Sequence, residues 1–309
     1  MAMDDMNTWI RYETNLQWAK WIEISPERMK QIVDDINSFH PVVPIQTTYG
    51  EFNFSVQCEK DISYINVLLS VAQHTFGEEP IESYGNLLDE AIIRRLKDLL
   101  FTINLAYPGC VSIFKSILFR DGKPVKVFLY SNDISGMAYE KCKWLSFENL
   151  TIQQCWDWIV NKTNFLSYVS RTPIDRALYA LSYESSANDD LFIFYVLLGI
   201  EAIYNNGSNQ EESISSQLKR KIQAVIGIFP SSTIKEINTM YKRRSALVHG
   251  SANIFKCWSS EDYEEEEYEK VSKEREYMVS ATGILLGTIQ KFIKVNANEL
   301  IENVTVSLK

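Results

Sequence analysis

Hydrophobic and polar positions predict a mixed set of helices and strands in the first half of the chain. Apolar anchors spaced along residues 9–37 indicate a helix there; they are Trp9, Trp18, Trp21, Ile22 and Met29. Alternation then predicts strands over 52–56 and 62–71. Helical spacing returns over 86–105, where Pro108-Gly109 ends the helix and Arg94, Arg95 and Lys97 are expected to point outward.

Two more strands are expected before the pattern changes, over 125–129 and 138–145, the first entered through the turn Asp121-Gly122-Lys123-Pro124. From about residue 148 only helical spacing remains. It predicts helices over 152–160, 173–183, 191–204, 213–226, 231–249 and 262–295. We therefore expect an α+β N-terminal domain over 1–147 and an all-α helical bundle of about five helices over 148–309.

Composition excludes several classes of protein. The 309 residues are 46% hydrophobic and carry a net charge of −9, which argues against coating nucleic acid or an anionic membrane with the whole surface. The longest apolar run, 191–200, is far shorter than the roughly 20 residues of a membrane span. The N-terminus lacks a signal-peptide pattern, and the five scattered cysteines indicate neither a disulfide framework nor a zinc site. A cytoplasmic protein without membrane contact is expected.

Common catalytic signatures are absent from the sequence. It contains no phosphate-binding glycine loop, no dinucleotide fingerprint, no HExxH and no GxSxG elbow, and only three histidines. No metal and no cofactor are therefore expected. His40 lies in a proline-broken loop, His74 ends a strand-like run, and Cys110 has no histidine partner in sight, so each has a structural interpretation.

His249 stands in a different context, at the end of a predicted helix and five residues after Arg244. A simple interpretation places both at a basic helix end, where the dipole favours cations. However, residues 216–244 contain seven basic residues against the single acid Glu236, in a chain that is acidic as a whole. This contrast favours a focused anion site beside the histidine.

Three ordered blocks then resemble one family. They are Leu197-Leu198-Gly199-Ile200-Glu201-Ala202-Ile203-Tyr204, Leu218-Lys219-Arg220-Lys221, and Tyr241-Lys242-Arg243-Arg244-Ser245-Ala246-Leu247-Val248-His249-Gly250. Together they resemble the HEPN superfamily (higher eukaryotes and prokaryotes nucleotide-binding), specifically its Apea-like branch. The resemblance covers residues 148–309, whereas the N-terminal half resembles no family that we can name.

The resemblance implies a dimer of all-α bundles, in which the Arg-x4–6-His motifs of two copies meet in one cleft. Many members are metal-independent endoribonucleases of toxin–antitoxin, CRISPR and anti-phage systems. By match to the motif, Arg244 and His249 would be the catalytic pair, and Glu201 would support them through a hydrogen bond. The partner of this bond would be either His249 or Arg244. Glu201 has an alternative interpretation as a helix-capping residue or a plain interhelical salt bridge. RNA contacts are expected from six residues, namely Lys219, Arg220, Lys221, Lys242, Arg243 and Ser245.

Two functions stay open at this stage. One is a homodimeric endoribonuclease, in antiviral defence or toxin-like growth arrest, whose N-terminal domain senses a trigger or selects substrate. The other is a non-catalytic RNA-binding, nucleotide-binding or partner-docking HEPN module. The acidic stretch 261–276, which includes Glu264 to Glu267, is either a solvated helix face or an autoinhibitory or antitoxin-facing surface that competes with RNA for the basic stretch. An antitoxin or a trigger protein would be the partner.

Overall fold

The structure is a computed structural model of the chain. It describes residues 8–19, 22–41, 44–47, 50–60, 64–73, 85–167, 169–185, 189–205, 214–228, 230–251 and 265–301. The chain divides into two compact units, and each is described by itself. Unit 1 comprises 1–140 and 149–157, and unit 2 comprises 141–148 and 158–309, so the boundary falls at the last residue of the helix Asp133–Lys141 and in the middle of the helix Ile152–Lys162.

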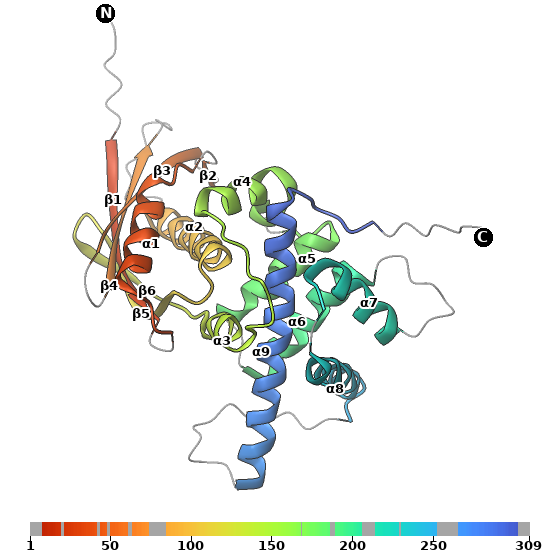
Figure 1. The fold of residues 1–309 in the computed structure, drawn as a ribbon. Helices are drawn as coiled ribbons and strands as arrows, with labels where there is room; N and C mark the ends of the chain where they lie inside the picture. The colour runs from red at the N-terminus through yellow and green to blue at the C-terminus, as the bar shows by residue number, and fades with distance from the viewer. Residues whose placement is uncertain are drawn as a thin grey trace, which may run out of the picture. The chain divides into compact units, whose positions relative to one another are not determined.

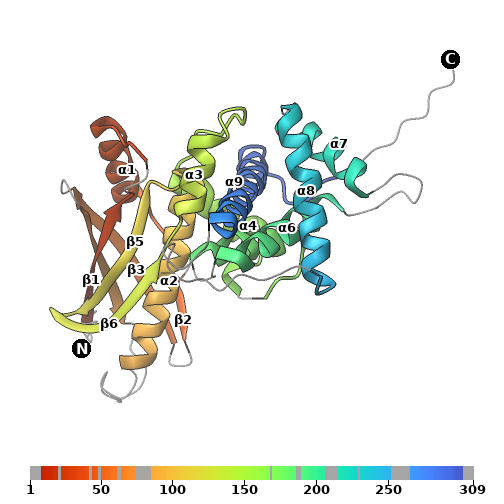
Figure 2. The same cartoon turned by 90° about the horizontal axis from the view of Figure 1, so that it is seen from below.

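Unit 1 is built on one antiparallel sheet with helices against it (Figure 1). Its strands run in the order β2-β3-β4-β1-β5-β6. Their bounds are β1 Thr8–Trp18, β2 Ile45–Thr47, β3 Gly50–Lys60, β4 Tyr64–Gln73, β5 Val111–Arg120 and β6 Lys123–Tyr130. Helices α1 (Pro26–Ser38) and α2 (Gly85–Ala106) lie on the same side of the sheet in two perpendicular views (Figure 2).

The strand β1 corrects our expectation of a helix over 9–37. Ile10, Tyr12 and Thr14 are all buried while Arg11 and Asn15 are exposed, which is the two-residue period of a strand. The widely spaced tryptophans had suggested a helix, but only Pro26–Ser38 of that range is helical. Ser25 caps this helix by accepting a hydrogen bond from the backbone N–H of Arg28, and Pro26 occupies its first turn.

Two further differences concern the segment after α2. The expected strand over 138–145 is wrong, because Asp133–Lys141 forms the helix α3. Gly136 on this helix packs against Gly109, where an added Cβ would lie 2.1 Å from the Gly136 Cα. The strand β5 was not expected at all. Its inward side chain at Ser116 is polar and its outward Ile117 is 40% exposed, which inverts the usual pattern.

The other helices and strands expected in unit 1 agree with the structure in the described residues. The strands over 52–56 and 125–129 lie within β3 and β6, and the described part of 62–71 lies within β4. The predicted helix over 86–105 is α2. The turn before β6 is the two-residue hairpin Asp121-Gly122, whose φ angles of 48° and 76° are both left-handed, as a tight hairpin turn requires.

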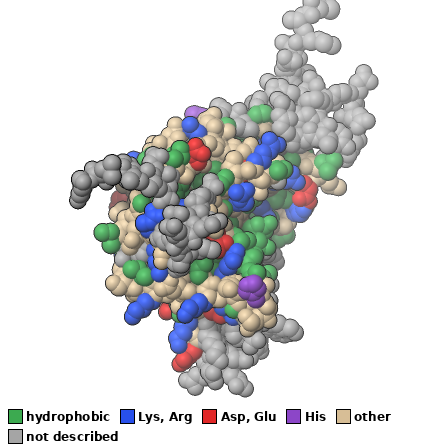
Figure 3. All heavy atoms as spheres, turned by 90° about the vertical axis from the view of Figure 1, so that its right-hand side faces the viewer, with side chains coloured by type: hydrophobic (Ala, Val, Ile, Leu, Met, Phe, Trp, Pro, Cys, Tyr) green, Lys and Arg blue, Asp and Glu red, His purple; other side chains and the backbone are tan. Residues whose placement is uncertain are grey.

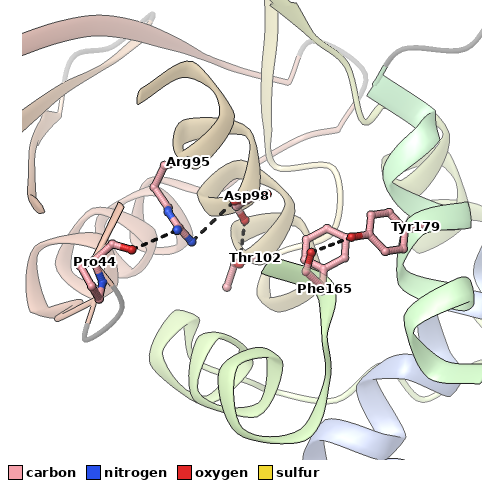
Figure 4. A network of polar contacts seen from close by, with 6 residues as sticks. All are labelled: Pro44, Arg95, Asp98, Thr102, Phe165 and Tyr179. Atoms are coloured by element: carbon pink, nitrogen blue, oxygen red, sulfur yellow. Dashed lines mark hydrogen bonds and ion pairs between the residues drawn. The ribbon is translucent and has the colours of Figure 1, made fainter. Parts of the chain in front are cut away.

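Arg95 corrects the expectation that the basic residues of α2 all point outward. Its side chain is only 8% exposed, and its guanidinium lies 5.6 Å from the centre of the Trp156 ring. Its Nη2 donates to the carbonyl oxygen of Pro44 (3.3 Å), and Nη1 lies 3.7 Å from Oδ2 of Asp98 (Figure 4). The arginine therefore fills a core position between its ion-pair partner and an aromatic ring, a role that helical spacing alone did not reveal.

Unit 2 is helical in the part of the chain that the structure describes. Its main helices are α5 Pro173–Ser182, α6 Asp189–Tyr204, α7 Ile214–Ile226, α8 Ser231–Val248 and α9 Glu265–Lys294, and it also holds the end of α4 (Ile152–Lys162). All six match predicted helices to within a few residues. The long helix α9 contacts α5, α6, α7 and α8 (Figure 1). Its residues Met278, Val279, Ala281, Ile284, Leu285, Leu286, Ile289 and Phe292 are buried.

Close packing and a buried carboxylate hold α5 in place. Gly199 of α6 allows the contact with α5, because a Cβ there would lie 2.9 Å from the Cβ of Ala180. At the start of α5, the fully buried Asp175 accepts hydrogen bonds from the backbone N–H groups of Asn164, Arg171 and Thr172. In return, the backbone N–H of Asp175 donates a capping hydrogen bond to Oγ1 of Thr172.

No helix in the described part of the chain is both long enough and apolar enough to cross a membrane.

Candidate functional site

Helix α8 carries both residues of the Arg-x4-His motif. Thr233, Ile237 and Met240 are buried along the helix and anchor it to the bundle. Its last residue is Val248, and His249 is the C-terminal cap, whose backbone N–H bonds to the carbonyl of Ser245 (3.0 Å). Gly250 follows with a φ of 68°, a left-handed conformation that glycine adopts without strain. His249 thus lies where the helix ends and the chain turns away.

Arg244 forms an ion pair with Glu201 of α6, across 43 residues of sequence. Its Nη2 donates to Oε2 of the carboxylate at 2.8 Å. The two side chains are 29% and 16% exposed, so the pair is half-buried rather than a surface contact. Burial raises the pKa of Glu201 above its ordinary value, and the charge of Arg244 opposes this. Of the two partners left open by the sequence for Glu201, the structure has Arg244.

Tyr241 adds a third polar group beside this pair. Burial raises the pKa of its phenol, the charge of Glu201 raises it further, and Arg244 lowers it. Its Oη is buried, and neither this oxygen nor Nε of Arg244 has a hydrogen-bond partner among the described residues. Unsatisfied buried polar atoms are rare in folded proteins. The site therefore holds hydrogen-bonding capacity that the described residues do not use.

His249 does not join the Glu201–Arg244 pair within one chain. Residues five apart on a helix differ by about 140° in direction, because each turn takes 3.6 residues. The side chain of His249 is exposed and makes no hydrogen bond to any described residue. One copy of the chain therefore presents the arginine and the histidine on different sides of the end of α8.

The six residues expected to contact RNA are not equally accessible. Arg220, Lys242 and Ser245 are exposed and Lys219 is half-buried, whereas Lys221 is only 5% exposed and lies in the core of unit 2. Arg243 is paired with Glu274 of α9, with 2.9 Å between Nε and Oε1. On the face that carries α7 and α8, Lys and Arg side chains are spread among hydrophobic ones (Figure 3).

A pocket of about 600 Å³ opens between α5 and α6, and Glu201 is one of its lining residues. The charged, aromatic and large apolar residues of its lining are Arg176, Tyr179, Tyr183, Tyr195, Leu198 and Glu201. Our sequence analysis missed this pocket. The signal available was the spacing of Tyr179 and Tyr183, one helical turn apart on the predicted helix, and of Leu198 and Glu201 on the next.

The remaining candidates take structural positions or lie outside the described residues. The backbone N–H of the exposed His40 donates to the side chain of Gln153 (2.9 Å). Cys110 is buried, and burial raises its pKa to about 11, as expected of a structural thiol. His74 and residues 261–264 are not described. Among the described residues, no cluster of three or more His, Cys, Asp or Glu side chains could hold a metal ion.

Comparisons with known proteins add no assignment. No protein-family model, no curated protein and no solved structure matches the chain. What the site can do chemically must therefore be argued from its own residues.

Proposed function

We propose that residues 148–309 form an HEPN-type domain and that the protein is a homodimeric, metal-independent endoribonuclease. The observation that carries this proposal is the half-buried pair between Glu201 and Arg244, with the exposed His249 at the end of the same helix. An arginine held by a carboxylate keeps a fixed direction, and its planar, permanently charged fork suits a phosphate. An exposed imidazole is accessible to a bound substrate and can act as a general base or acid in proton transfer.

The proposed reaction needs no group beyond these residues and the RNA. The ribose 2′-oxygen attacks the adjacent phosphorus, a new P–O2′ bond forms, and the bond from phosphorus to the 5′-oxygen breaks. His249 takes the proton from the 2′-hydroxyl and returns a proton to the departing 5′-oxygen, so that the imidazole ends in the state in which it began; such proton transfer is worth ~10²–10⁴ in rate. Arg244 stabilises the charge that grows on the phosphoryl oxygens.

A second copy of the chain resolves the geometry of this site. Within one chain, Arg244 and His249 point in different directions from the end of α8. A two-fold axis near this end would bring the arginine of one copy and the histidine of the other to one phosphate. In such a dimer, hydrogen-bonding atoms left unused in one chain, namely Nε of Arg244 and Oη of Tyr241, would lie near the shared cleft.

The test is RNA cleavage by the full-length protein in EDTA. Labelled single-stranded RNA and transfer RNA are incubated with wild type, Arg244→Ala, His249→Ala and the control Arg275→Ala, which removes one exposed cation from α9. We expect cleavage by wild type and the control, and a loss of ~10²-fold or more in the two site variants. Equal activity in His249→Ala would overturn the proposal.

Mixing the two site variants tests the dimer. Arg244→Ala and His249→Ala are each expected to be inactive alone, but a mixed dimer retains one arginine and one histidine that can share a cleft. Partial recovery of cleavage on mixing is therefore expected. No recovery in a sample whose subunits are shown to exchange would argue against a shared cleft.

A non-catalytic RNA-binding or docking module is the second candidate, favoured by the internal pairing of the basic residues. Arg244 is neutralised by Glu201 and Arg243 by Glu274, so neither cation is unpaired in this chain. For a binding module, RNA affinity should depend steeply on salt and on Lys219 and Lys242. It should be the same in wild type and His249→Ala, and neither protein should cleave RNA.

A further inference from the structure

The pocket between α5 and α6 has aromatic walls and an apolar floor. Tyr183 and Tyr195 stack with their ring centres 4.2 Å apart and their planes inclined by 15°. The Tyr183 side of this stack is 42% exposed, so aromatic surface faces the solvent at the mouth of the pocket. Ala180 is buried at the floor. The volume of about 600 Å³ is within the range of small-ligand sites.

The third tyrosine is held rigidly. Tyr179 donates from its Oη to the carbonyl oxygen of Phe165 at 2.9 Å, and the two rings lie 5.2 Å apart (Figure 4). Because both ends of this side chain are fixed, it cannot swing in to fill the pocket. A pocket with a rigid aromatic wall is prepared for a flat, apolar-faced ligand before that ligand arrives.

The lining of the pocket includes two charged side chains. Arg176 is exposed on α5, and Glu201 is on α6 with a side chain only 16% exposed. Oε2 of Glu201 accepts the bond from Arg244, and no described residue donates a hydrogen bond to its Oε1. An ionised carboxylate only accepts hydrogen bonds, so the ligand should present N–H donors along one edge. Arg176, the exposed cation of the lining, would suit an anionic group of the ligand.

We propose that this pocket binds a guanine base of the RNA, stacked against the tyrosines, with its N1–H and N2–H groups directed at Glu201. Guanine is the base whose pairing edge carries two adjacent N–H donors, whereas adenine and cytosine place one amino group beside an acceptor. Enzymes that act on single nucleotides commonly read a base this way, by stacking and by hydrogen bonds to its pairing edge. Glu201 would then join base recognition on one side to the phosphate-binding Arg244 on the other.

This inference rests on the proposed function for its biological meaning, but its test does not depend on cleavage. Binding of GMP, AMP, CMP, UMP and ribose 5-phosphate to the full-length protein is measured by titration calorimetry. We expect GMP to bind most tightly. Tyr183→Leu and Tyr195→Leu should each weaken GMP binding by about tenfold, in line with the worth of base–aromatic stacking. The control Tyr277→Leu removes a half-buried tyrosine of α9 that does not line the pocket, and should bind as wild type does.

Glu201→Gln tests whether Glu201 selects guanine by accepting its N–H groups. A glutamine offers both a donor and an acceptor, so the preference for GMP over AMP should disappear while stacking remains. Ribose 5-phosphate binding as tightly as GMP, or GMP affinity unchanged in both tyrosine variants, would overturn the proposal. Equal affinity of wild type for all four nucleotides would overturn the assignment to guanine. Circular dichroism and urea unfolding check that each variant is folded, and Arg176→Ala, at an exposed position, gives a second variant with little risk to folding.

The failure of this inference is distinguishable from that of the proposed function. His249 does not line the pocket, so His249→Ala should bind GMP as wild type does. A protein that binds GMP through its tyrosines but never cleaves RNA would retain the pocket and lose the nuclease. A protein that cleaves RNA in EDTA without binding GMP would support the nuclease and overturn the guanine pocket.

Discussion

The interaction between Glu201 and Arg244 can be measured directly by a double-mutant cycle. The cycle compares unfolding free energies of wild type, Glu201→Ala, Arg244→Ala and the double variant. The two side chains are 16% and 29% exposed and joined by a 2.8 Å hydrogen bond. Exposed pairs contribute about 0.2–1 kcal/mol, and breaking fully buried pairs costs about 3–5 kcal/mol. For this half-buried pair we expect a coupling energy of about 1–3 kcal/mol.

The single variants should show why the coupling has this size. Removing Glu201 leaves a half-buried guanidinium whose Nε already lacks a partner, and hydrogen bonds to charged groups are worth about 1.5–3 kcal/mol. Removing Arg244 leaves a carboxylate whose pKa burial already raises, so more of it is protonated in the folded protein. Arg244→Ala should therefore be the milder of the two variants.

The assay is urea unfolding at neutral pH followed by circular dichroism. A matched control cycle uses Glu269 and Lys273 on α9, an i,i+4 pair 4.0 Å apart whose side chains are 68% and 65% exposed. That pair should give a coupling of about 0.5 kcal/mol or less. A coupling for Glu201 and Arg244 no larger than that of the control pair would refute our account of how Arg244 is held.

Two further predictions concern the packing around the site. Asp175→Asn should lower the unfolding free energy by about 3 kcal/mol, because one amide oxygen cannot replace two carboxylate oxygens that together accept four hydrogen bonds. The control Glu276→Gln, at an exposed position, should change the unfolding free energy little. Burial raises the pKa of Asp175, but the backbone N–H groups outweigh burial and hold this pKa below its usual value of 3.8. The contribution of Asp175 to stability is therefore present above about pH 4 and is lost as the pH falls through the lowered pKa. Urea unfolding measured across acid pH should show a shallower loss of stability in the asparagine variant, and equal slopes would contradict this. Gly199→Ala should destabilise unit 2 by about 1–3 kcal/mol, because the added Cβ would lie 2.9 Å from the Cβ of Ala180. The control Gly287→Ala, where Leu145 comes no nearer than 3.5 Å, should be neutral or stabilising by about 0.5–1 kcal/mol. Thermal unfolding compares the two variants, and a larger loss of stability in Gly287→Ala would show that the contact of Gly199 with α5 is not tight.

The helices of unit 2 could be predicted from sequence because their apolar spacing is long and regular. The segment 191–204 fits this description, and it forms α6 with only the two acidic residues Asp189 and Asp190 added at its start. The strand β1 could not be predicted, because the spacing of its tryptophans at 9 and 18 indicated a helix and masked the short alternation that buries Ile10 and Tyr12. Local spacing decides an element only where one period clearly dominates.

Burial of charged residues was harder to predict than the elements themselves. Arg95 and Lys221 both occupy positions that a helical wheel assigns to solvent or to a ligand, yet both are buried. Long basic side chains can lie along apolar surface and still find a partner, and sequence spacing carries no record of that partner. The accessible basic residues near the motif are consequently fewer than the sequence suggested.

The candidate site shows the same division between local and long-range information. The motif residues Arg244 and His249 were identified from one helix, and the carboxylate Glu201 from the family resemblance. The tyrosines of the pocket were each visible in the sequence. That their two helix faces enclose a cavity depends on how α5 and α6 pack, which involves Gly199 and residues of α9 far along the chain.

The most direct test of the central claim is the chemistry of the RNA ends. Wild type and His249→Ala are incubated in EDTA with an RNA of known sequence and with a copy carrying a single 2′-deoxynucleotide at the cleaved position. We predict that wild type cuts the RNA, leaves a 2′,3′-cyclic phosphate and does not cut the deoxy copy at that position, and that His249→Ala cuts neither. Cleavage of the deoxy copy, or equal cleavage by the two proteins, would contradict attack by the 2′-hydroxyl assisted by His249.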